Sequence, residues 1–238
     1  MTPDLIYDVL DHTWPAASYR HVGPWLIREG SGGGQRVSAA TPEAAFEASD
    51  IPQAEAAMTA LGQAPLFMLR HGDGRLDAML AARGYLRHDP VVLYAAALAD
   101  LAMPAPSAMS AFSIWPPLSI AVDLWAEAGI GPGRLAVMHR VKGPKTSILG
   151  RVNDRASGVA FVACHHKIAM LHALEVSPTQ RRQGSAINIM RMAAIWAQDH
   201  GAESLCLAVT EENVAARALY AALGMQAVGT YHYRVRHS

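Results

Sequence analysis

Hydrophobic and polar residues follow one another along this chain with periods that identify most of its helices and strands. A period near 3.6 residues predicts a helix, and alternating or continuous apolar runs predict strands. Several predicted helices end at a glycine, the usual residue after a helix C-terminus. The predicted helices are residues 4–10, 50–61, 76–83, 120–128, 134–141, 185–200 and 213–223. The predicted strands are residues 25–29, 35–39, 66–70, 91–95, 146–151, 159–165, 168–176, 204–209 and 230–235.

The order of these elements predicts an α/β fold built on a mixed sheet. Four prolines between residues 103 and 117 indicate a linker, because proline at that density stops regular structure. We therefore divide the chain into a first half (residues 1–103), a proline-rich linker (104–117) and a second half (118–238). We expect each half to be a twisted mixed sheet flanked by helices.

The two halves share a short pattern. Residues 76–85 resemble residues 216–225: each segment is a helix that ends in a glycine, followed by a large apolar residue and a strand. In this alignment Leu80 matches Tyr220. The pattern predicts that the halves are structural repeats.

Composition narrows the function classes. Twenty basic and twenty acidic residues give a net charge of zero, which argues against nucleic-acid binding. Two cysteines do not make a disulfide framework. The N-terminus lacks the pattern of a signal peptide, and the longest apolar run is too short to span a membrane. We expect a cytoplasmic protein without membrane contact.

The candidate chemistry begins where the strand at 168–176 runs through a polar loop into the helix at 185–200. Gly184 allows a ligand to approach the backbone closely, and Arg181 and Arg182 add positive charge. The free N–H groups of a helix N-terminus bind anions. Thirty residues on, Asn213, Arg217 and Tyr220 lie at helical spacing and would share one stripe.

In this order and separation, the two patterns resemble the GNAT superfamily of N-acyltransferases. The resemblance is good over residues 146–235 and loose over 111–143. It implies that the backbones of Leu174 and Val176 bind the pantetheine arm of acetyl-CoA, and that Asn213 and Arg217 contact the cofactor. Tyr220 would protonate the leaving thiolate. The pyrophosphate would be held by the loop and first helical turn formed by Arg181, Arg182, Gln183, Gly184, Ser185 and Ala186.

An acetyltransferase also needs a base, because an alkylamine is protonated at neutral pH. His172 is the first candidate, since residues 171–176 resemble the corresponding strand of arylalkylamine N-acetyltransferases. By alternation along a strand, His172 would share a face with Leu174 and Val176, and Glu175 would lie on the opposite face. Glu175 and chains of water leading to solvent are the alternatives.

Other groups carry weaker patterns. Cys164, His165 and His166 resemble metal ligands, but neighbours on a strand point to opposite faces and no second cluster completes a site. We expect no metal. The glycine run at 30–34 predicts a flexible hairpin rather than a phosphate site.

These observations predict an N-acetyltransferase that moves an acetyl group from acetyl-CoA to a primary amine through a tetrahedral intermediate. The acceptor is expected to be a small molecule, and an oligomer is compatible with the sequence. The first half has no equivalent of the loop at 181–186, so it resembles a degenerate GNAT copy. The alternative is a non-catalytic acyl-CoA sensor or partner-binding module.

Overall fold

The computed structural model describes residues 2–101 and 104–236. The predicted ends of the two halves at residues 1, 102–103 and 237–238 lie outside the described residues. The helices are α1 (Pro3–Thr13), α2 (Ile51–Ala60), α3 (Gly74–Ala82), α4 (Leu98–Leu101), α5 (Ser119–Glu127), α6 (Pro132–Arg140), α7 (Ser185–Asp199) and α8 (Val214–Ala222). The 3-10 helices are η1 (Gln35–Val37), η2 (Ala48–Asp50) and η3 (Pro178–Gln180).

The strands are β1 (Ser18–Val22), β2 (Trp25–Glu29), β3 (Thr41–Pro42), β4 (Leu66–Leu69), β5 (Leu86–Ala97), β6 (Ala111–Ile114), β7 (Lys145–Val152), β8 (Arg155–His165), β9 (Ile168–Val176), β10 (Ser204–Thr210) and β11 (Gln226–Val235). Eight of them form one sheet in the order β4-β11-β5-β10-β9-β8-β7-β6, and β1-β2-β3 form a small second sheet. The large sheet is mixed, because β9 and β10 run parallel and the other pairs antiparallel. The predicted α/β class is confirmed.

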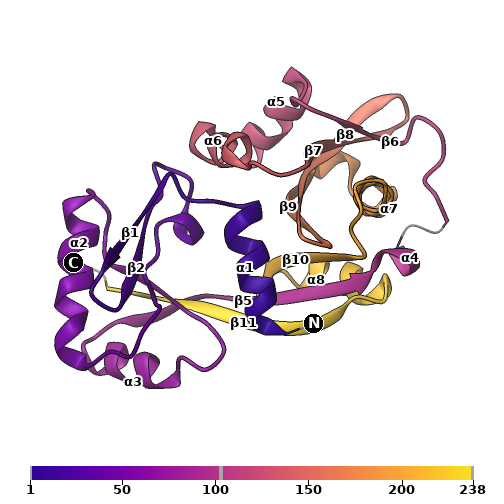
Figure 1. Ribbon diagram of the computed structural model, residues 1–238. Coiled ribbons are helices and arrows are strands. Elements are labelled where there is room, and N and C mark those ends of the chain that lie inside the picture. Colours follow the sequence, from indigo (N-terminus) through magenta and orange to yellow (C-terminus); the bar gives the residue numbers. More distant parts are fainter. Residues whose placement is uncertain (1, 102–103, 237–238) are drawn as a thin grey trace.

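The large sheet is shared by the two halves, whereas the sequence predicted one sheet in each. Strand β5 of the first half pairs with β10 on one side and β11 on the other. Strand β11 in turn lies between β5 and β4. Figure 1 shows β5 and β11 running side by side across the molecule below α1. This placement of β5 between two strands of the second half, and of β11 between two strands of the first half, pairs strand edges that each half would otherwise leave open.

The segments that lead into these two strands have the same geometry. Gly84 after α3 and Gly224 after α8 have φ angles of +82° and +80°. The next residues, Tyr85 and Met225, are buried, and each donates its N–H to a carbonyl five residues back, that of Leu80 or Tyr220. Both helices therefore end in the Schellman arrangement, for which glycine in the left-handed region is the favoured residue.

Helices cover both faces of the large sheet. Helix α7 packs on one face, where its core includes Ile189 and Met190 and extends to Tyr220 of α8. Helices α1, α5 and α6 cover the opposite face. Trp125 of α5 is fully buried there. The sheet is thereby the middle layer of three.

Two predicted segments differ from the structure. Residues 35–39 were expected to pair with β2, but β2 pairs with β1, and residues 35–37 form η1. Gly32 and Gly34 have φ angles of +78° and +94°, which break an extended path before Gln35. The proline-rich segment also contains the strand β6, because its prolines flank residues 111–114 and leave their N–H groups available to β7.

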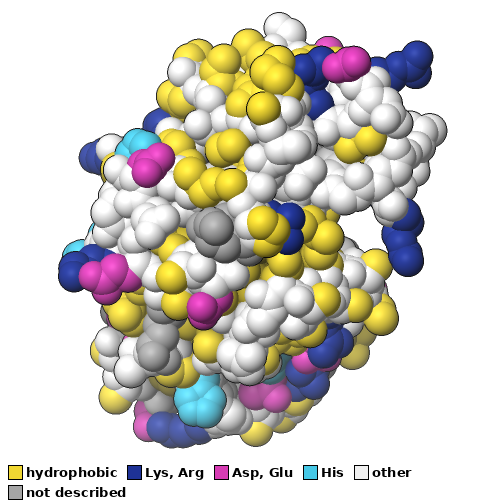
Figure 2. All heavy atoms as spheres, turned by 90° about the vertical axis from the view of Figure 1, so that its right-hand side faces the viewer, with side chains coloured by type: hydrophobic (Ala, Val, Ile, Leu, Met, Phe, Trp, Pro, Cys, Tyr) yellow, Lys and Arg dark blue, Asp and Glu magenta, His cyan; other side chains and the backbone are white. Residues whose placement is uncertain are grey.

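Figure 2 shows how charge is distributed on one face of the molecule. On the face shown in Figure 2, charged side chains of both signs are scattered among hydrophobic ones, and Lys and Arg do not gather in one patch. Among the residues that the structure describes, no helix has the length and apolar character needed to cross a bilayer.

The shared sheet leads to a first prediction about folding. A fragment of residues 118–238 lacks β5, so the edges of β10 and β11 that pair with it become exposed. We expect the fragment to lack a cooperative unfolding transition in circular dichroism, whereas the full chain shows one. A well-dispersed amide NMR spectrum from the fragment alone would contradict this prediction.

Candidate active site

A cleft opens where strands β9 and β10 separate. Their parallel pairing extends from Ile168 and Ser204 to Leu171 and Leu207, and beyond those residues the strands no longer pair with each other. A cavity of about 520 Å³ lies at this point. Its walls come from residues 171–175 and 207–210, from Asn213 and Tyr220, and from Trp14, residues 33–36, Asp89 and Val91 of the first half.

A β-bulge in β9 shapes one wall of this cleft. Phe161 of β8 pairs with His172 and Val159 pairs with Glu175, so two residues of β9 lie opposite one residue of β8. Ala173, inside the bulge, has a φ of +51°, which is uncommon for a residue other than glycine. Its carbonyl accepts a hydrogen bond of 2.8 Å from the indole N–H of Trp125.

The bulge overturns the strand-face expectation for this segment. Leu174 packs with Leu171 against the α7 side of the sheet, whereas His172 faces α1 on the other side. Glu175 lines the cleft together with His172 rather than lying on the opposite face. The reason is that one extra residue resets the alternation of side chains.

His172 is 5% exposed and both of its ring nitrogens are engaged. Nε2 lies 2.9 Å from Oγ1 of Thr13, whose hydroxyl proton is donated to the carbonyl of Val9. Nε2 must therefore carry the ring proton, and Nδ1 accepts from Arg36 at 3.3 Å. Burial, and then the charge of Arg36, hold the pKa of His172 well below 6.5. The imidazole is thus neutral at physiological pH.

Glu175 and Tyr220 have pKa values shifted upwards. Burial raises the pKa of Glu175 above 4.5, and the charges of Arg181 and Arg134 offset part of that rise. Burial, and then the charge of Glu175, raise the pKa of the Tyr220 hydroxyl above its usual value. Both side chains line the cleft, so a group able to accept a proton and a group able to donate one share a single site.

The predicted phosphate loop lies between β9 and α7. Gly184 is the N-cap of α7 with a φ of +83°, and no side chain caps the first N–H groups of the helix. Arg181, Arg182 and Gln183 are exposed, as is Gly184. The buried hydroxyl of Ser185 bonds inward to Ser157 at 2.7 Å. No capping side chain therefore binds the N–H groups in the first turn of α7.

The remaining predicted cofactor residues lie in different places. Asn213 lines the cleft and caps α8 by accepting from the N–H of Ala216 at 3.1 Å. Arg217 does not line the cleft, and its Nη1 donates to the carbonyl of Glu211. Val176 and Arg181 border a smaller hollow of about 230 Å³ against α5. Ala186 and the residues from Arg182 to Ser185 line neither hollow.

The first half and the last strand contribute residues that the sequence did not indicate. Trp14 stands at the end of α1 with its ring centroid 4.9 Å from that of His172. Arg36 comes from η1, and Tyr231 and Tyr233 come from β11. These residues are more than 50 positions from β9 in the chain, and no spacing pattern connects them to it.

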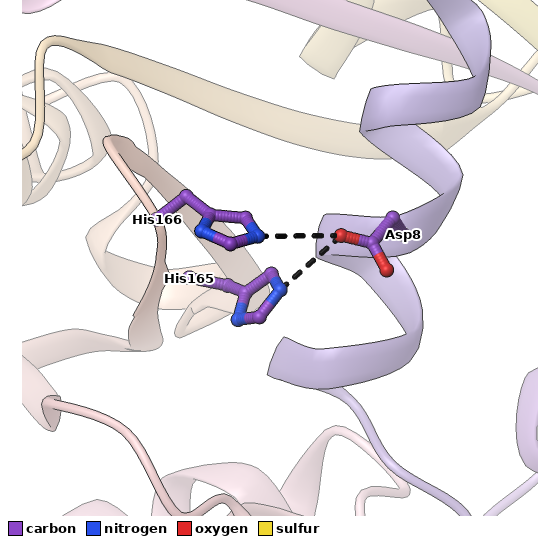
Figure 3. A group of neighbouring side chains, drawn as sticks. All are labelled: Asp8, His165 and His166. Atoms are coloured by element: carbon purple, nitrogen blue, oxygen red, sulfur yellow. Dashed lines mark hydrogen bonds and ion pairs between the residues drawn. The ribbon is translucent and has the colours of Figure 1, made fainter.

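His165 and His166 meet a partner that the sequence did not reveal. Both approach one carboxylate oxygen of Asp8 on α1, with Nε2 to Oδ2 distances of 3.2 Å and 3.9 Å (Figure 3). The two histidines reach the same side because His166 lies in the hairpin turn, with a φ of +52°, and not within the strand. The three donor atoms are close enough together to hold a metal ion. Cys164 is buried, and burial raises the pKa of its thiol to about 11.

Comparison with known proteins identifies the second half. Residues 118–225 match the model of the acetyltransferase (GNAT) family. These residues form a GNAT domain. It contains the cleft wall of β9, the uncapped start of α7 and Tyr220, which supports N-acetyltransferase activity in the broad sense.

Similarity to other proteins extends beyond the GNAT domain. The chain is 26% identical over 234 residues to the uncharacterized N-acetyltransferase YobR of Bacillus subtilis, with 94% of each chain covered. A GCN5-related N-acetyltransferase from Kribbella flavida has the same fold, with a TM-score of 0.73 and 17% identity over 99% of this chain and 96% of that one. A tandem GNAT protein from the clavulanic acid biosynthesis pathway superposes with a TM-score of 0.59 and 15% identity. The match covers 89% of this chain and 77% of that one.

The lowered pKa of His172 predicts how stability changes with pH. Below about pH 6.5 the unfolded chain binds a proton at this histidine that the folded chain rejects. Stability should therefore fall as pH decreases from about 6.5, by up to about 1.4 kcal/mol per pH unit for one proton. In urea unfolding measured at several pH values, the His172→Gln protein should lose less stability per pH unit than the wild type, whereas a protein with the exposed Arg20→Gln control substitution should lose as much as the wild type. Equal slopes in the three proteins would contradict the prediction.

Proposed function

We propose that this protein transfers the acetyl group of acetyl-CoA to the primary amine of a small molecule. The observation that carries this proposal is the convergence of Glu175 and Tyr220 on the cleft where β9 leaves β10. The reaction requires a proton acceptor for the incoming ammonium and a proton donor for the leaving thiolate. The matched GNAT family supports the same chemistry.

The residues around the start of α7 fit acetyl-CoA. The uncapped N–H groups after Gly184 and the positive end of the helix dipole suit a pyrophosphate, and Arg181 and Arg182 are exposed beside them. Past Leu171, β9 has no strand partner on its β10 side, so the backbones of Leu174 and Val176 are candidates to bind the pantetheine arm. Asn213 lines the cleft from the other side.

The reaction follows from these positions. A carboxylate accepts a proton from the ammonium, and the free amine attacks the thioester carbon. A tetrahedral intermediate forms and carries an oxyanion. Its collapse breaks the carbon–sulfur bond, and Tyr220 donates a proton to the departing sulfur. The attacking nitrogen loses its second proton to the phenolate of Tyr220 or to solvent, and the carboxylate releases the first proton to solvent. The products are the N-substituted acetamide and CoA.

Two residues compete for the role of base, and their surroundings favour Glu175. Both nitrogens of His172 are occupied, and protonation would place a second positive charge beside Arg36. Glu175 has a raised pKa, which brings it nearer to the pH at which the enzyme would work. We propose Glu175 as the base, acting directly or through water, with His172 as the alternative.

We further propose that the halves are repeats of one fold and that only the second holds acetyl-CoA. The matching ends of α3 and α8 and the exchange of β5 and β11 support a repeat. Leu80 occupies the position that corresponds to Tyr220, so the first half lacks the proton donor. The first half would serve the acceptor side of the cleft, to which it contributes Trp14 and Arg36.

The role of Tyr220 gives a prediction that also tests the proposed function. Tyr220→Phe should reduce kcat by about 10²- to 10⁴-fold, because the lost proton matters in the transition state. The affinity for acetyl-CoA, measured by calorimetry, should change little. Tyr94→Phe is the control, because the ring centroid of Tyr94 lies 5.8 Å from that of Tyr220 but Tyr94 does not line the cleft. The proposed function fails if the wild-type protein does not bind acetyl-CoA at millimolar concentration.

The choice of base predicts a pH profile. With Glu175 as base, kcat/KM rises with pH through a pKa above 4.5, because only the carboxylate accepts the proton. Glu175→Gln should lower kcat/KM and abolish this rise, whereas His172→Gln should retain it. The pH at which kcat/KM rises does not by itself distinguish the two candidate bases. The pKa of Glu175 is raised and that of His172 is lowered, so the two shift toward each other. Loss of the rise in His172→Gln only would assign the base to His172.

A further inference from the structure

Arg36 brings a positive charge into the acceptor side of the cleft without a carboxylate to balance it. Its Nε donates to the hydroxyl of Tyr231 at 3.2 Å, and its Nη1 to Nδ1 of His172 at 3.3 Å. Tyr233 lies close enough to interact with the guanidinium as well. All three partners are neutral side chains. Within residues 2–101 and 104–236, Arg36 forms no ion pair.

Three other arginines with little exposure each bind a carboxylate in this fold. Arg28 and Arg70 share the carboxylate of Asp11 at 2.9 Å and 2.8 Å, with side chains 1% and 21% exposed. Arg234 is 13% exposed and binds Asp77 at 2.7 Å. A desolvated charge is costly unless an opposite charge compensates it. Arg36 is partly buried, lines the cleft and lacks this compensation.

We propose that Arg36 binds a carboxylate of the acceptor, so that the acceptor is an amine that also carries a carboxylate group. This inference rests on the proposed function and defines its substrate class. A guanidinium has five N–H donors, and the contacts to Tyr231, His172 and Tyr233 use at most three of them. The remaining two match the two oxygens of a carboxylate, which arginine binds in a bidentate manner.

The opposite charges of the cleft suit a zwitterion. Glu175 and Asp89 line the same cavity as Arg36, so it presents negative charge for an ammonium and positive charge for a carboxylate. Trp14 adds an apolar surface beside His172. The acetyl-CoA phosphates have a separate candidate position at the start of α7, whose residues do not line this cavity. The carboxylate on Arg36 is therefore assigned to the acceptor and not to the cofactor.

The test compares matched acceptors that differ only in the carboxylate. Thiol release from acetyl-CoA is measured for a panel of amino acids, for the corresponding amino acid amides and for the decarboxylated amines. We expect kcat/KM to be at least about tenfold higher for one or more amino acids than for their amide and amine counterparts, since one lost charged hydrogen bond is worth about that much. Arg36→Gln should remove the preference and leave the affinity for acetyl-CoA unchanged.

Controls separate recognition from folding and from cofactor binding. Arg36→Lys keeps the charge but loses the bidentate geometry, so it should restore part of the preference. Arg20→Gln changes an exposed arginine on β1 and should have no effect. Equal kcat/KM values across the matched series overturn the carboxylate proposal, as does a panel in which none of the amino acids reacts although acetyl-CoA binds. A protein that does not bind acetyl-CoA fails the proposed function itself.

Discussion

The end of pairing between β9 and β10 is the feature on which the candidate site depends. Parallel strands that continued to pair would fill the position of the cleft with backbone hydrogen bonds. Here the bulge at Ala173 turns β9 away, and the indole N–H of Trp125 binds the Ala173 carbonyl. A buried carbonyl without a partner is costly, so this hydrogen bond from α5 helps to make the bulge tolerable. The same bulge places His172 and Glu175 on the same cavity.

The first half is part of this arrangement and not an appendage. Strand β5 pairs with β10 on the side away from β9. The place where β10 lacks a strand partner is therefore the gap that opens between β9 and β10. Helix α1 then brings Thr13 and Trp14 against His172. A sheet made from the second half alone would have neither β5, which lies between β10 and β11, nor this wall. The first half therefore contributes to the packing of the sheet and to the shape of the cleft.

The sequence predicted the parts of the fold that local interactions determine. The segment at 168–176 is the strand β9 as expected, and the helices before Gly84 and Gly224 end where glycine allows a left-handed residue. The loop between β9 and α7 was also predicted, because its glycine and arginines are neighbours in the chain, and its role in binding phosphate stays a proposal. The bulge was not predicted, because the residue at position 173 is alanine, which does not favour a positive φ angle. Without the bulge, strand alternation placed Glu175 on the wrong face.

The surroundings of His172 were not predictable for a related reason. Its partners Thr13 and Arg36 lie 159 and 136 residues away in the chain, so only the tertiary fold brings them to the ring. The prediction of residues 35–39 as a strand would have left Arg36 in a hairpin. The 3-10 helix after Gly34 instead directs it to the cleft. Roles that depend on such long-range contacts, including the recognition of an acceptor, leave no trace in local spacing.

The contact between His172 and Arg36 links the two questions of base and acceptor. Arg36 donates to Nδ1, and Thr13 fixes the proton on Nε2, so the neutral imidazole serves as a fixed acceptor for the guanidinium. A protonated His172 would lose this hydrogen bond and repel Arg36 at the same time. The neutral ring therefore keeps the guanidinium oriented, with its charge available to an anion. A histidine in this environment is better suited to orienting Arg36 than to collecting the proton of an attacking amine, which supports the proposal that Glu175 is the base.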